Sequence, residues 1–319
     1  MADARLVIGV DGGGSRCTAV LARRSAERGL DLLGRGHGGP ANPRTAGHDA
    51  ARLAIAAAVE GAFADAGIAP EPAEAICLGL AGVGRVEDRD AVVAWATQAA
   101  LGGRVIVVPD GLLPFADGHA EPWGIVLISG TGSLALARPR GLPLAEESPC
   151  ERCGGWGPLL GDEGSGYAIG LAALRAVMRS SDGRGPATIL HEAMRRRFTV
   201  ATAADLVARL HASGVGRREV ADVAREVVAA ADVEDAVATA ILGGAAADLA
   251  AHVITLARRL DLAAGVYPLR LAGGLLTGSV TLRRMVLAAI VEAGHEPGMV
   301  IVVADPAASA AQFAALATV

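Results

Sequence analysis

Two short segments of the chain combine glycines with hydroxyl or carboxylate side chains, a pattern suited to binding phosphate. The first reads Asp-Gly-Gly-Gly-Ser at positions 11–15 and follows an apolar run at 6–10. The second reads Ser-Gly-Thr-Gly-Ser at positions 129–133 and lies between two apolar runs. Because glycine has no Cβ, backbone N–H groups in such loops can approach a phosphate closely. Each segment alone is also compatible with a hairpin turn, but their corresponding places in two half-chains favour a shared ligand.

The second segment differs from the two best-known nucleotide-binding motifs. No Gly-Lys-Ser/Thr follows it, so it is not a Walker A loop. A strand is predicted after it instead of a helix, so it is not a Rossmann fingerprint. In the first segment Asp11 ends the apolar run, where a carboxylate suits a magnesium ion held directly or through water.

Two further glycine-rich segments could contact the rest of a bound molecule. Gly273 and Gly274 follow a predicted strand and could admit a flat ring against the backbone, although a plain turn would look the same. Positions 153–166 contain six glycines around Trp156 and an Asp-Glu pair. A Trp ring offers a face for the C–H surface of a sugar, and carboxylates accept hydrogen bonds from hydroxyl groups. A core Trp with an acidic helix cap is the alternative, and the density of glycine favours a site.

Asp110 and Asn42 are the remaining polar candidates. Asp110 follows a predicted strand at 104–108, where functional side chains of α/β sheets gather, and is a candidate base for an attacking hydroxyl. Asn42 lies in a loop rich in Gly and Pro and could bind an amide or a hydroxyl. Both could equally be ordinary turn residues. Cys150 and Cys153 have the spacing of only half a zinc site, so a metal or iron–sulfur role is not favoured.

The hydrophobic pattern predicts two half-chains with a similar beginning. In the first half, strands at 5–10, 17–22 and 30–34 form an antiparallel meander, because tight turns join them. Helices then alternate with strands, and a polar stretch at 117–123 is the predicted boundary. The remaining predicted elements of this half are helices at 49–66 and 88–101 and strands at 75–80 and 104–108. Those of the second half are strands at 124–128, 133–137, 268–271 and 299–303, and helices at 166–179, 186–197, 203–213, 217–231, 234–260, 280–293 and 306–316.

Composition narrows the classes of protein to which the chain can belong. Of its 319 residues, 52% are hydrophobic and only 3% aromatic, so Ala, Val and Leu must fill the cores. The net charge of −5 and the lack of a basic patch make a nucleic-acid partner unexpected. The four cysteines do not suit a secreted disulfide scaffold, which favours a cytoplasmic protein with reduced thiols. No membrane span is predicted, because no run of about 18 uninterrupted apolar residues occurs.

Together these motifs resemble the BadF/BadG/BcrA/BcrD-type ATPase family of the actin/hexokinase/Hsp70 superfamily, and within it the N-acetylglucosamine kinases. The resemblance covers nearly the whole chain, although positions 180–260 add little to it. It implies an α/β fold of two ribonuclease-H-like, actin-like ATPase domains around a central cleft. The first domain would span 1–118 and the second 119–305 with a helical insertion, while the last helix, 306–319, would pack back on the first. The residues that carry the resemblance lie at 11–15, 128–133, 153–157 and 161–165, and at Asp110.

The resemblance also implies a reaction, the ATP-dependent phosphorylation of the 6-hydroxyl of an amino sugar in the presence of Mg²⁺. Asp110 would be the catalytic base and Asp11 would serve the metal ion. The residues implied to bind ATP with Asp11 are Gly12, Gly13, Gly14, Ser15, Thr131 and Gly132 at the phosphates, and Gly273 and Gly274 near adenosine. The residues implied to hold the sugar are Asn42, Ser133, Gly155, Trp156 and Asp162.

Two positions depart from the pattern of these kinases. Ser15 replaces a common Thr, and Leu134 stands where similar sugar kinases often carry a polar residue, which leaves the N-acetyl preference open. Glucosamine and N-acetylmuramate kinases therefore remain alternatives. An ATPase activator of a dehydratase or reductase is a rival of another class, but the close pair Cys150 and Cys153 fits its shared iron–sulfur cluster poorly. A non-catalytic sugar sensor is a further rival. A small amino sugar is the expected partner, and a homodimer is compatible with it.

Overall fold

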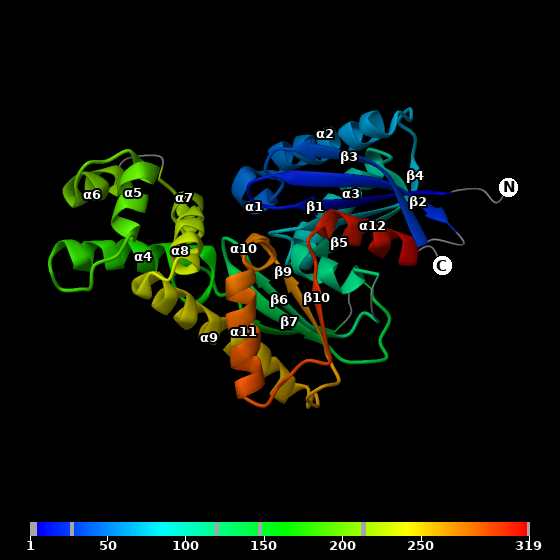
Figure 1. Ribbon diagram of the computed structural model, residues 1–319. Helices are drawn as coiled ribbons and strands as arrows, with labels where there is room; N and C mark the ends of the chain where they lie inside the picture. Colours follow the sequence, from blue (N-terminus) through cyan, green and yellow to red (C-terminus); the bar gives the residue numbers. More distant parts are fainter. Residues whose placement is uncertain (1–4, 26–28, 119–120, 146–148, 212–214, 318–319) are drawn as a thin grey trace. The chain divides into compact units, whose positions relative to one another are not determined.

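The computed structural model describes the chain except residues 1–4, 26–28, 119–120, 146–148, 212–214 and 318–319 (Figure 1). The chain divides into two compact units. Unit 1 contains residues up to Trp123, the segment Arg140–Pro149 and the C-terminal segment from Asp305, and unit 2 contains Gly124–Pro139 and Cys150–Ala304. The C-terminal segment thus belongs to the same unit as the N-terminal strands.

The sheet of unit 1 has the order β3-β2-β1-β4-β5. The first three strands pair antiparallel, which confirms the predicted meander, and β4 and β5 extend the sheet in parallel. A short helix α1 and a 3₁₀ helix η1, both missing from the prediction, follow β3 and β5. The elements of unit 1 are β1 (Leu6–Gly12), β2 (Cys17–Ser25), β3 (Gly29–Gly38), α1 (Pro43–Ala46), α2 (His48–Ala66), β4 (Ala73–Leu80), α3 (Val86–Gln98), β5 (Gly102–Pro109), η1 (Asp110–Ala116) and α12 (Pro306–Leu316).

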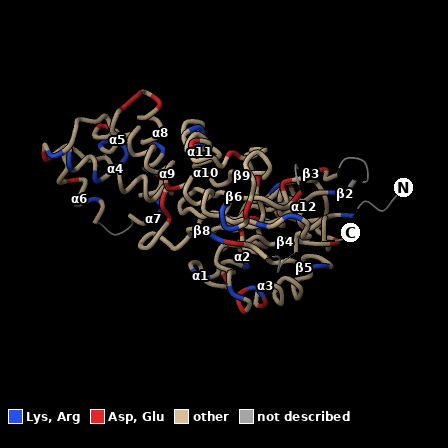
Figure 2. Tube along the Cα trace, turned by 90° about the horizontal axis from the view of Figure 1, so that it is seen from below, with Lys and Arg blue, Asp and Glu red and all other residues tan. Residues whose placement is uncertain are grey.

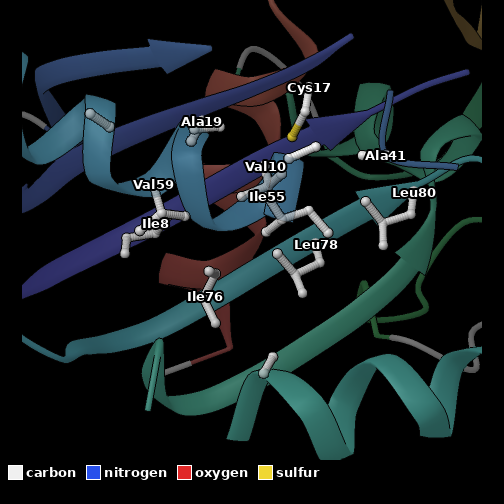
Figure 3. Packing of buried hydrophobic residues seen from close by; sticks show 14 of the residues in the cluster. Ile8, Val10, Cys17, Ala19, Ala41, Ile55, Val59, Ile76, Leu78 and Leu80 are labelled. Carbon is white, nitrogen blue, oxygen red and sulfur yellow. The ribbon is translucent and has the colours of Figure 1, made fainter. Parts of the chain in front are cut away.

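Small residues let the helices of unit 1 approach its sheet closely. Alternate residues of β1 face opposite sides of the sheet. Ile8 and Val10 join the core beneath α2 (Figure 3), whereas Gly9 faces α12. On β3, glycines at every second position lie against the backbone of α2, and a Cβ at Gly36 would stand only 1.9 Å from the carbonyl oxygen of Ala58. The unit therefore compensates for its few aromatic residues by bringing backbones close together.

Unit 2 repeats the topology of unit 1. Its sheet has the order β10-β9-β6-β7-β8. Strands β6, β7 and β8 pair antiparallel, while β9 and β10 extend the sheet in parallel from β6. This agreement confirms the predicted likeness of the two half-chains. The strands are β6 (Gly124–Ser129), β7 (Ser133–Arg138), β8 (Glu151–Gly154), β9 (Pro268–Ala272) and β10 (Met299–Val302), of which β8 was not predicted.

The helices of unit 2 begin at side-chain caps in several places. Ser165, Asp235 and Ser279 accept hydrogen bonds from the first turns of α4, α9 and α11. The predicted helix at 217–231 is wrong as a single element, because Val223 separates two helices there. The helices are α4 (Gly166–Ser181), α5 (Leu190–Phe198), α6 (Ala203–His211), α7 (Arg217–Asp222), α8 (Ala224–Asp232), α9 (Ala236–Arg259), α10 (Gly274–Gly278) and α11 (Val280–Glu292).

Helix α9 is the longest of these and packs against β7, β8 and β6 and against α8 and α11. Within the described part of the chain it alone has the length and apolar composition that a membrane-crossing helix needs. Its buried residues, among them Leu242, Leu249 and Leu256, give it the contacts of a core helix. Figure 2 shows acidic and basic residues interspersed along the chain, with neither sign confined to one unit.

Replacing Gly9 by Ala should destabilise the protein by about 3 kcal/mol, the order expected for overpacking a rigid core. The added Cβ would stand 2.0 Å from the nitrogen of Ala311 and 2.3 Å from the carbonyl oxygen of Ala307, so α12 would have to move. Urea denaturation monitored by circular dichroism measures the change.

Gly244→Ala is the matched control for this substitution. Gly244 lies exposed on α9 with open space where its Cβ would be, so Ala should stabilise the helix by up to about 1 kcal/mol. Equal free energies of unfolding for the two variants would contradict the packing of β1 against α12.

Candidate functional site

In the loop between β1 and β2, carbonyl oxygens are bonded to neighbouring segments, while two backbone N–H groups have no partner among the described residues. The carbonyl of Gly12 accepts from the N–H of Ala81 at 2.9 Å, and that of Gly13 accepts from Ala41 at 2.9 Å. The N–H of Gly13 closes the turn by bonding to Arg16 at 3.0 Å. Among the described residues, no partner bonds the N–H groups of the exposed residues at positions 14 and 15.

The glycines of this loop are not all explained by the fold. Gly12 is required by packing, because a Cβ there would stand 2.4 Å from Leu80. Gly13 and Gly14 meet no atom closer than 3.8 Å, and neither has a positive φ angle. A hairpin turn that needs glycine does so because of a positive φ angle, so the hairpin alternative does not account for these two glycines. Neither packing nor backbone conformation among the described residues therefore requires glycine at these two positions.

Two carboxylates stand at the ends of strands beside this loop. Asp11 is half-buried at the end of β1, and Asp110 follows β5 as the first residue of η1. Burial raises the pKa of Asp11 to about 6, repulsion from Asp110 and Asp305 adds to the increase, and Arg16 opposes it. The pKa of Asp110 is also raised, because many protein atoms surround the carboxylate and remove part of its hydration, although the residue as a whole is exposed. A hydrogen bond of 3.0 Å from the Gly111 N–H partly offsets this shift.

Asn42 lies next to the same loop and caps a helix. Its Oδ1 accepts a hydrogen bond of 2.9 Å from the N–H of Arg44 at the start of α1. Gly82, which has a φ of +86°, fits tightly against this side chain, because a Cβ there would stand 2.2 Å from Oδ1. The Asn42 side chain is therefore fixed in position, while its amide nitrogen makes no hydrogen bond within the described part of the chain.

The loop between β6 and β7 in unit 2 is built on the same plan. Its carbonyl oxygens at Gly130 and Thr131 accept from the N–H groups of Gly166 at 2.8 Å and Tyr167 at 3.4 Å, which begin α4. The N–H of Gly130 closes the turn onto Gly132 at 2.9 Å. The N–H groups of Thr131 and Gly132 have no hydrogen-bond partner among the residues described. In each unit, the loop that follows the first strand thus contains backbone N–H groups without a partner among the described residues.

The third and fourth glycine-rich segments meet this second loop. Ser129 and Ser133 donate their hydroxyls to the carbonyls of Gly164 at 2.9 Å and Glu163 at 2.6 Å. Gly273 has a φ of +86° and packs so tightly against Ser129 that a Cβ would stand 2.4 Å from its carbonyl oxygen. Three of the four segments found in the sequence therefore form one cluster in unit 2. Gly274, the residue after Gly273, is exposed at the start of α10.

Asp162 is the buried centre of this cluster. It has a φ of +58° and a side chain that is 6% exposed. One carboxylate oxygen accepts from the Ser133 N–H at 3.4 Å, and the other forms an ion pair with Arg217. A Cβ at Gly132 would lie 2.8 Å from the Arg217 guanidinium and 3.2 Å from each Asp162 oxygen. Sequence reasoning missed Arg217, because no motif or spacing distinguishes it from the other arginines of the helical insertion.

Trp156 and Gly155 form the outer edge of the cluster. Trp156 is 67% exposed, and the guanidinium of Arg152 lies 4.3 Å from its ring centroid. Gly155 has a φ of +73°. Beneath them His252 on α9 fills the space where Gly154 would carry a Cβ, and its Nε2 lies 3.8 Å from a carboxylate oxygen of Glu163. Burial lowers the pKa of His252, although Glu163 and Asp248 act in the opposite direction.

The predicted residues thus fall into two sets, one in each unit. Within the described residues, no group of three or more His, Cys, Asp or Glu side chains is arranged to hold a metal ion. The thiols of Cys150 and Cys153 are free. The set in unit 1 is Asp11, Gly12, Gly13, Gly14, Ser15, Asn42 and Asp110, and the set in unit 2 is Thr131, Gly132, Ser133, Gly155, Trp156, Asp162, Gly273 and Gly274.

The BadF/BadG/BcrA/BcrD ATPase family matches residues 8–317 of the sequence. The chain belongs to this family. This confirms the resemblance inferred from the motifs, and the match includes both glycine-hydroxyl loops. The two-domain α/β fold expected of the family is also confirmed, since the structure has a five-stranded sheet in each unit.

Several relatives of this ATPase family member are sugar kinases. The N-acetylmuramic acid/N-acetylglucosamine kinase of Clostridium acetobutylicum is 32% identical over 85% of this chain and 86% of its own length. The structure of a candidate N-acetylglucosamine kinase from Chromobacterium violaceum is 28% identical with a TM-score of 0.74, and the match covers 97% of this chain and 98% of the other. A ROK family glucokinase from Streptomyces griseus, solved with glucose and AMPPNP, shares the fold with a TM-score of 0.54 at 17% identity over 97% of this chain and 99% of its own.

Asp11→Asn should stabilise the ligand-free protein by about 1–2 kcal/mol near pH 7.5. This free energy is smaller than the full pKa shift would give, because solvent screens a group that is only partly buried. The folded-state pKa of about 6 exceeds the ordinary value of 3.8. The folded state therefore binds this proton more tightly than the unfolded chain, and wild-type stability falls as the pH rises from about 4 through 6.

Urea denaturation at several pH values measures this difference. The gap between the variant and the wild type should narrow steadily as the pH is lowered toward 4. Asp90→Asn, which changes an exposed carboxylate on α3, is the control and should show no such pH dependence. A gap independent of pH would exclude a raised pKa at Asp11.

Proposed function

We propose that this protein is an ATP-dependent kinase that phosphorylates the 6-hydroxyl of an amino sugar, with N-acetylglucosamine as the favoured substrate. One observation carries the proposal. The loop after the first strand of each unit has carbonyls bonded to the protein, while four of its N–H groups have no partner within the described chain: those of Gly14 and Ser15 in unit 1 and of Thr131 and Gly132 in unit 2. Free amides beside glycines suit the oxygens of a polyphosphate. Sugar kinases among the relatives support the same reaction.

The proposal assigns both loops to one ATP molecule. Gly12, Gly13, Gly14 and Ser15 would bind its outer phosphates together with Thr131 and Gly132, and Gly273 and Gly274 would lie near the adenosine. Membership of an ATPase family supports ATP as the nucleotide. The exposed Gly274 and the positive φ of Gly273 leave backbone free of side chains for a flat ring.

A magnesium ion fits the carboxylates of unit 1. Asp11 and Asp110 repel each other, and this repulsion contributes to the raised pKa of Asp11. A divalent cation would relieve it, and carboxylate oxygens are the ligands that Mg²⁺ prefers. We assign Asp11 to the ion, which when bound would neutralise charge on the phosphates. The loop amides and Asp110 remain the protein's own contribution to catalysis.

Asp110 is the proposed base of the reaction. In the transfer, the bond between the γ-phosphorus and the bridging oxygen breaks, a bond from the sugar 6-oxygen forms, and ADP leaves. The hydroxyl proton passes to the Asp110 carboxylate. The raised pKa of Asp110 makes it a better proton acceptor than an ordinary Asp. The hydrogen bond from Gly111 holds the carboxylate in place.

The proposed sugar ligands are already oriented by the fold. Asn42 and Asp162 each use side-chain oxygens in protein contacts, and the Ser133 hydroxyl donates to Glu163 while its oxygen can still accept. In the proposed complex, the side-chain N–H groups of Asn42 would donate to the sugar, and the oxygens of Asp162 and Ser133 would accept from its hydroxyls. The exposed Trp156 ring suits the C–H face of a pyranose, and Gly155 leaves space beside it.

A cytoplasmic site of action, where ATP is supplied, belongs to the same proposal.

Asp110→Asn should lower kcat by about 10²–10⁴-fold, the usual contribution of a general base. The KM for the sugar should change little, because Asn keeps the shape and the hydrogen bond from Gly111. Coupled ADP-release kinetics measure both constants, with Asp90→Asn as the control that should match the wild type. Near-normal turnover by Asp110→Asn would remove Asp110 from its role.

An ADP-release screen identifies the substrate. We expect N-acetylglucosamine to give the highest kcat/KM among N-acetylglucosamine, N-acetylmuramate, glucosamine, N-acetylmannosamine and glucose. Sugar binding without ADP release from any of the five would refute the kinase assignment and favour a sugar sensor.

A further inference from the structure

The Arg217 guanidinium lies where the two functional loops of unit 2 meet. Its Nη2 bonds to Asp162, and it lies so close to Gly132 that a Cβ there would stand 2.8 Å away. Gly132 belongs to the loop with free amides, and Asp162 belongs to the segment assigned to the sugar. One cation therefore contacts both parts of the candidate site.

The position of Arg217 is set by its partner. Asp162 is buried and held by the Ser133 N–H. The ion pair uses only one nitrogen of Arg217, so its Nε and Nη1 have no hydrogen-bond partner within the described residues. The side chain remains 42% exposed. An arginine anchored at one nitrogen, with a partly exposed side chain and further N–H donors, is arranged to bind an anion with little further loss of conformational freedom.

The composition of the chain limits the side chains that could neutralise phosphate charge. The sequence contains no lysine at all, so every permanently charged side-chain cation is an arginine. Charge neutralisation in phosphoryl transfer commonly depends on Lys or Arg beside the phosphates. In unit 2, Arg217 is the cation that the described contacts place against the Thr131–Gly132 turn.

We propose that Arg217 binds an anionic oxygen of the substrates at the junction of Gly132 and Asp162. This inference rests on the proposed function of the loop and extends it to a residue of the helical insertion. Two substrates could supply the oxygen. The first is the phosphoryl group in transit, whose equatorial oxygens carry the charge throughout the transfer. The second is the carboxylate of an acidic amino sugar such as N-acetylmuramic acid.

Arg217→Met tests the proposal, with Arg218→Met as the matched control. Arg218 is the next residue of α7, is exposed, and contacts neither Asp162 nor Gly132, so both variants lose the same charge from the same helix. Steady-state kinetics with ATP and either N-acetylglucosamine or N-acetylmuramic acid are measured for each variant. Calorimetric binding of inorganic tripolyphosphate and of each sugar is measured without catalysis.

The two sources predict different losses. If the oxygen belongs to the phosphoryl group, Arg217→Met lowers kcat by about 10²–10³-fold with both sugars and weakens tripolyphosphate binding about tenfold or more. If it belongs to the sugar, KM and Kd rise about tenfold or more for N-acetylmuramic acid alone. Either pattern, absent from Arg218→Met, supports the proposal.

Other results would overturn it. Equal increases in KM for both sugars, with kcat and tripolyphosphate binding unchanged, would show that Arg217 acts only by positioning Asp162. A variant indistinguishable from Arg218→Met would exclude any role. Arg217→Met could fail to fold because Asp162 loses its partner, and Arg217→Lys then replaces it, since Lys keeps the ion pair but lacks the planar guanidinium. For Arg217→Lys, the kcat or the affinity named above should fall about tenfold relative to the wild type. A wild type without turnover would refute the kinase, whereas the calorimetric measurements would still test Arg217.

Discussion

Close approach of one backbone to another through glycine is the constraint on which this structure depends. Gly9 lets α12 pack on β1, Gly36 lets α2 pack on β3, and Gly273 lets the start of α10 pack on Ser129. The chain has 42 glycines and few aromatic side chains, so short helix–sheet distances replace large side chains in filling the cores. The same device places the functional loops, because tight packing behind them fixes the direction of their peptide groups.

Charge is handled in opposite ways in the two units. In unit 1, burial and repulsion from Asp110 both raise the pKa of Asp11, so its ionised form destabilises the folded protein. In unit 2, the buried Asp162 has the Arg217 guanidinium as a partner. Two neighbouring carboxylates favour binding of a cation or a proton, whereas a carboxylate in an ion pair keeps a fixed position. The proposed base and metal ligand are therefore the carboxylates of unit 1, whereas the carboxylate of Asp162 in unit 2 is held by its ion pair.

Most of the strands and helices could be predicted from the sequence, because apolar periodicity reports directly which face of an element is buried. The failures are physical in origin. The strand β8 is only four residues long, too short for an alternating pattern. In η1, all residues after Asp110 are buried and one of them is a proline, so no helical periodicity appears. The break at Val223 separates α7 from α8, and the residues on both sides have side chains that helices accept, so local propensity gives no signal for the break.

The candidate site shows a similar limit. Its glycine loops could be found because glycine is a local signal, but their partners depend on contacts between distant segments. Ser129 meets Gly164 and Gly273, and Asp162 meets Arg217 across 55 positions of sequence. Arginine is the chain's general surface cation in the absence of lysine, so composition cannot distinguish the one that reaches Gly132. The contact of Arg217 with Asp162 and its position beside Gly132 are therefore known only from the folded structure.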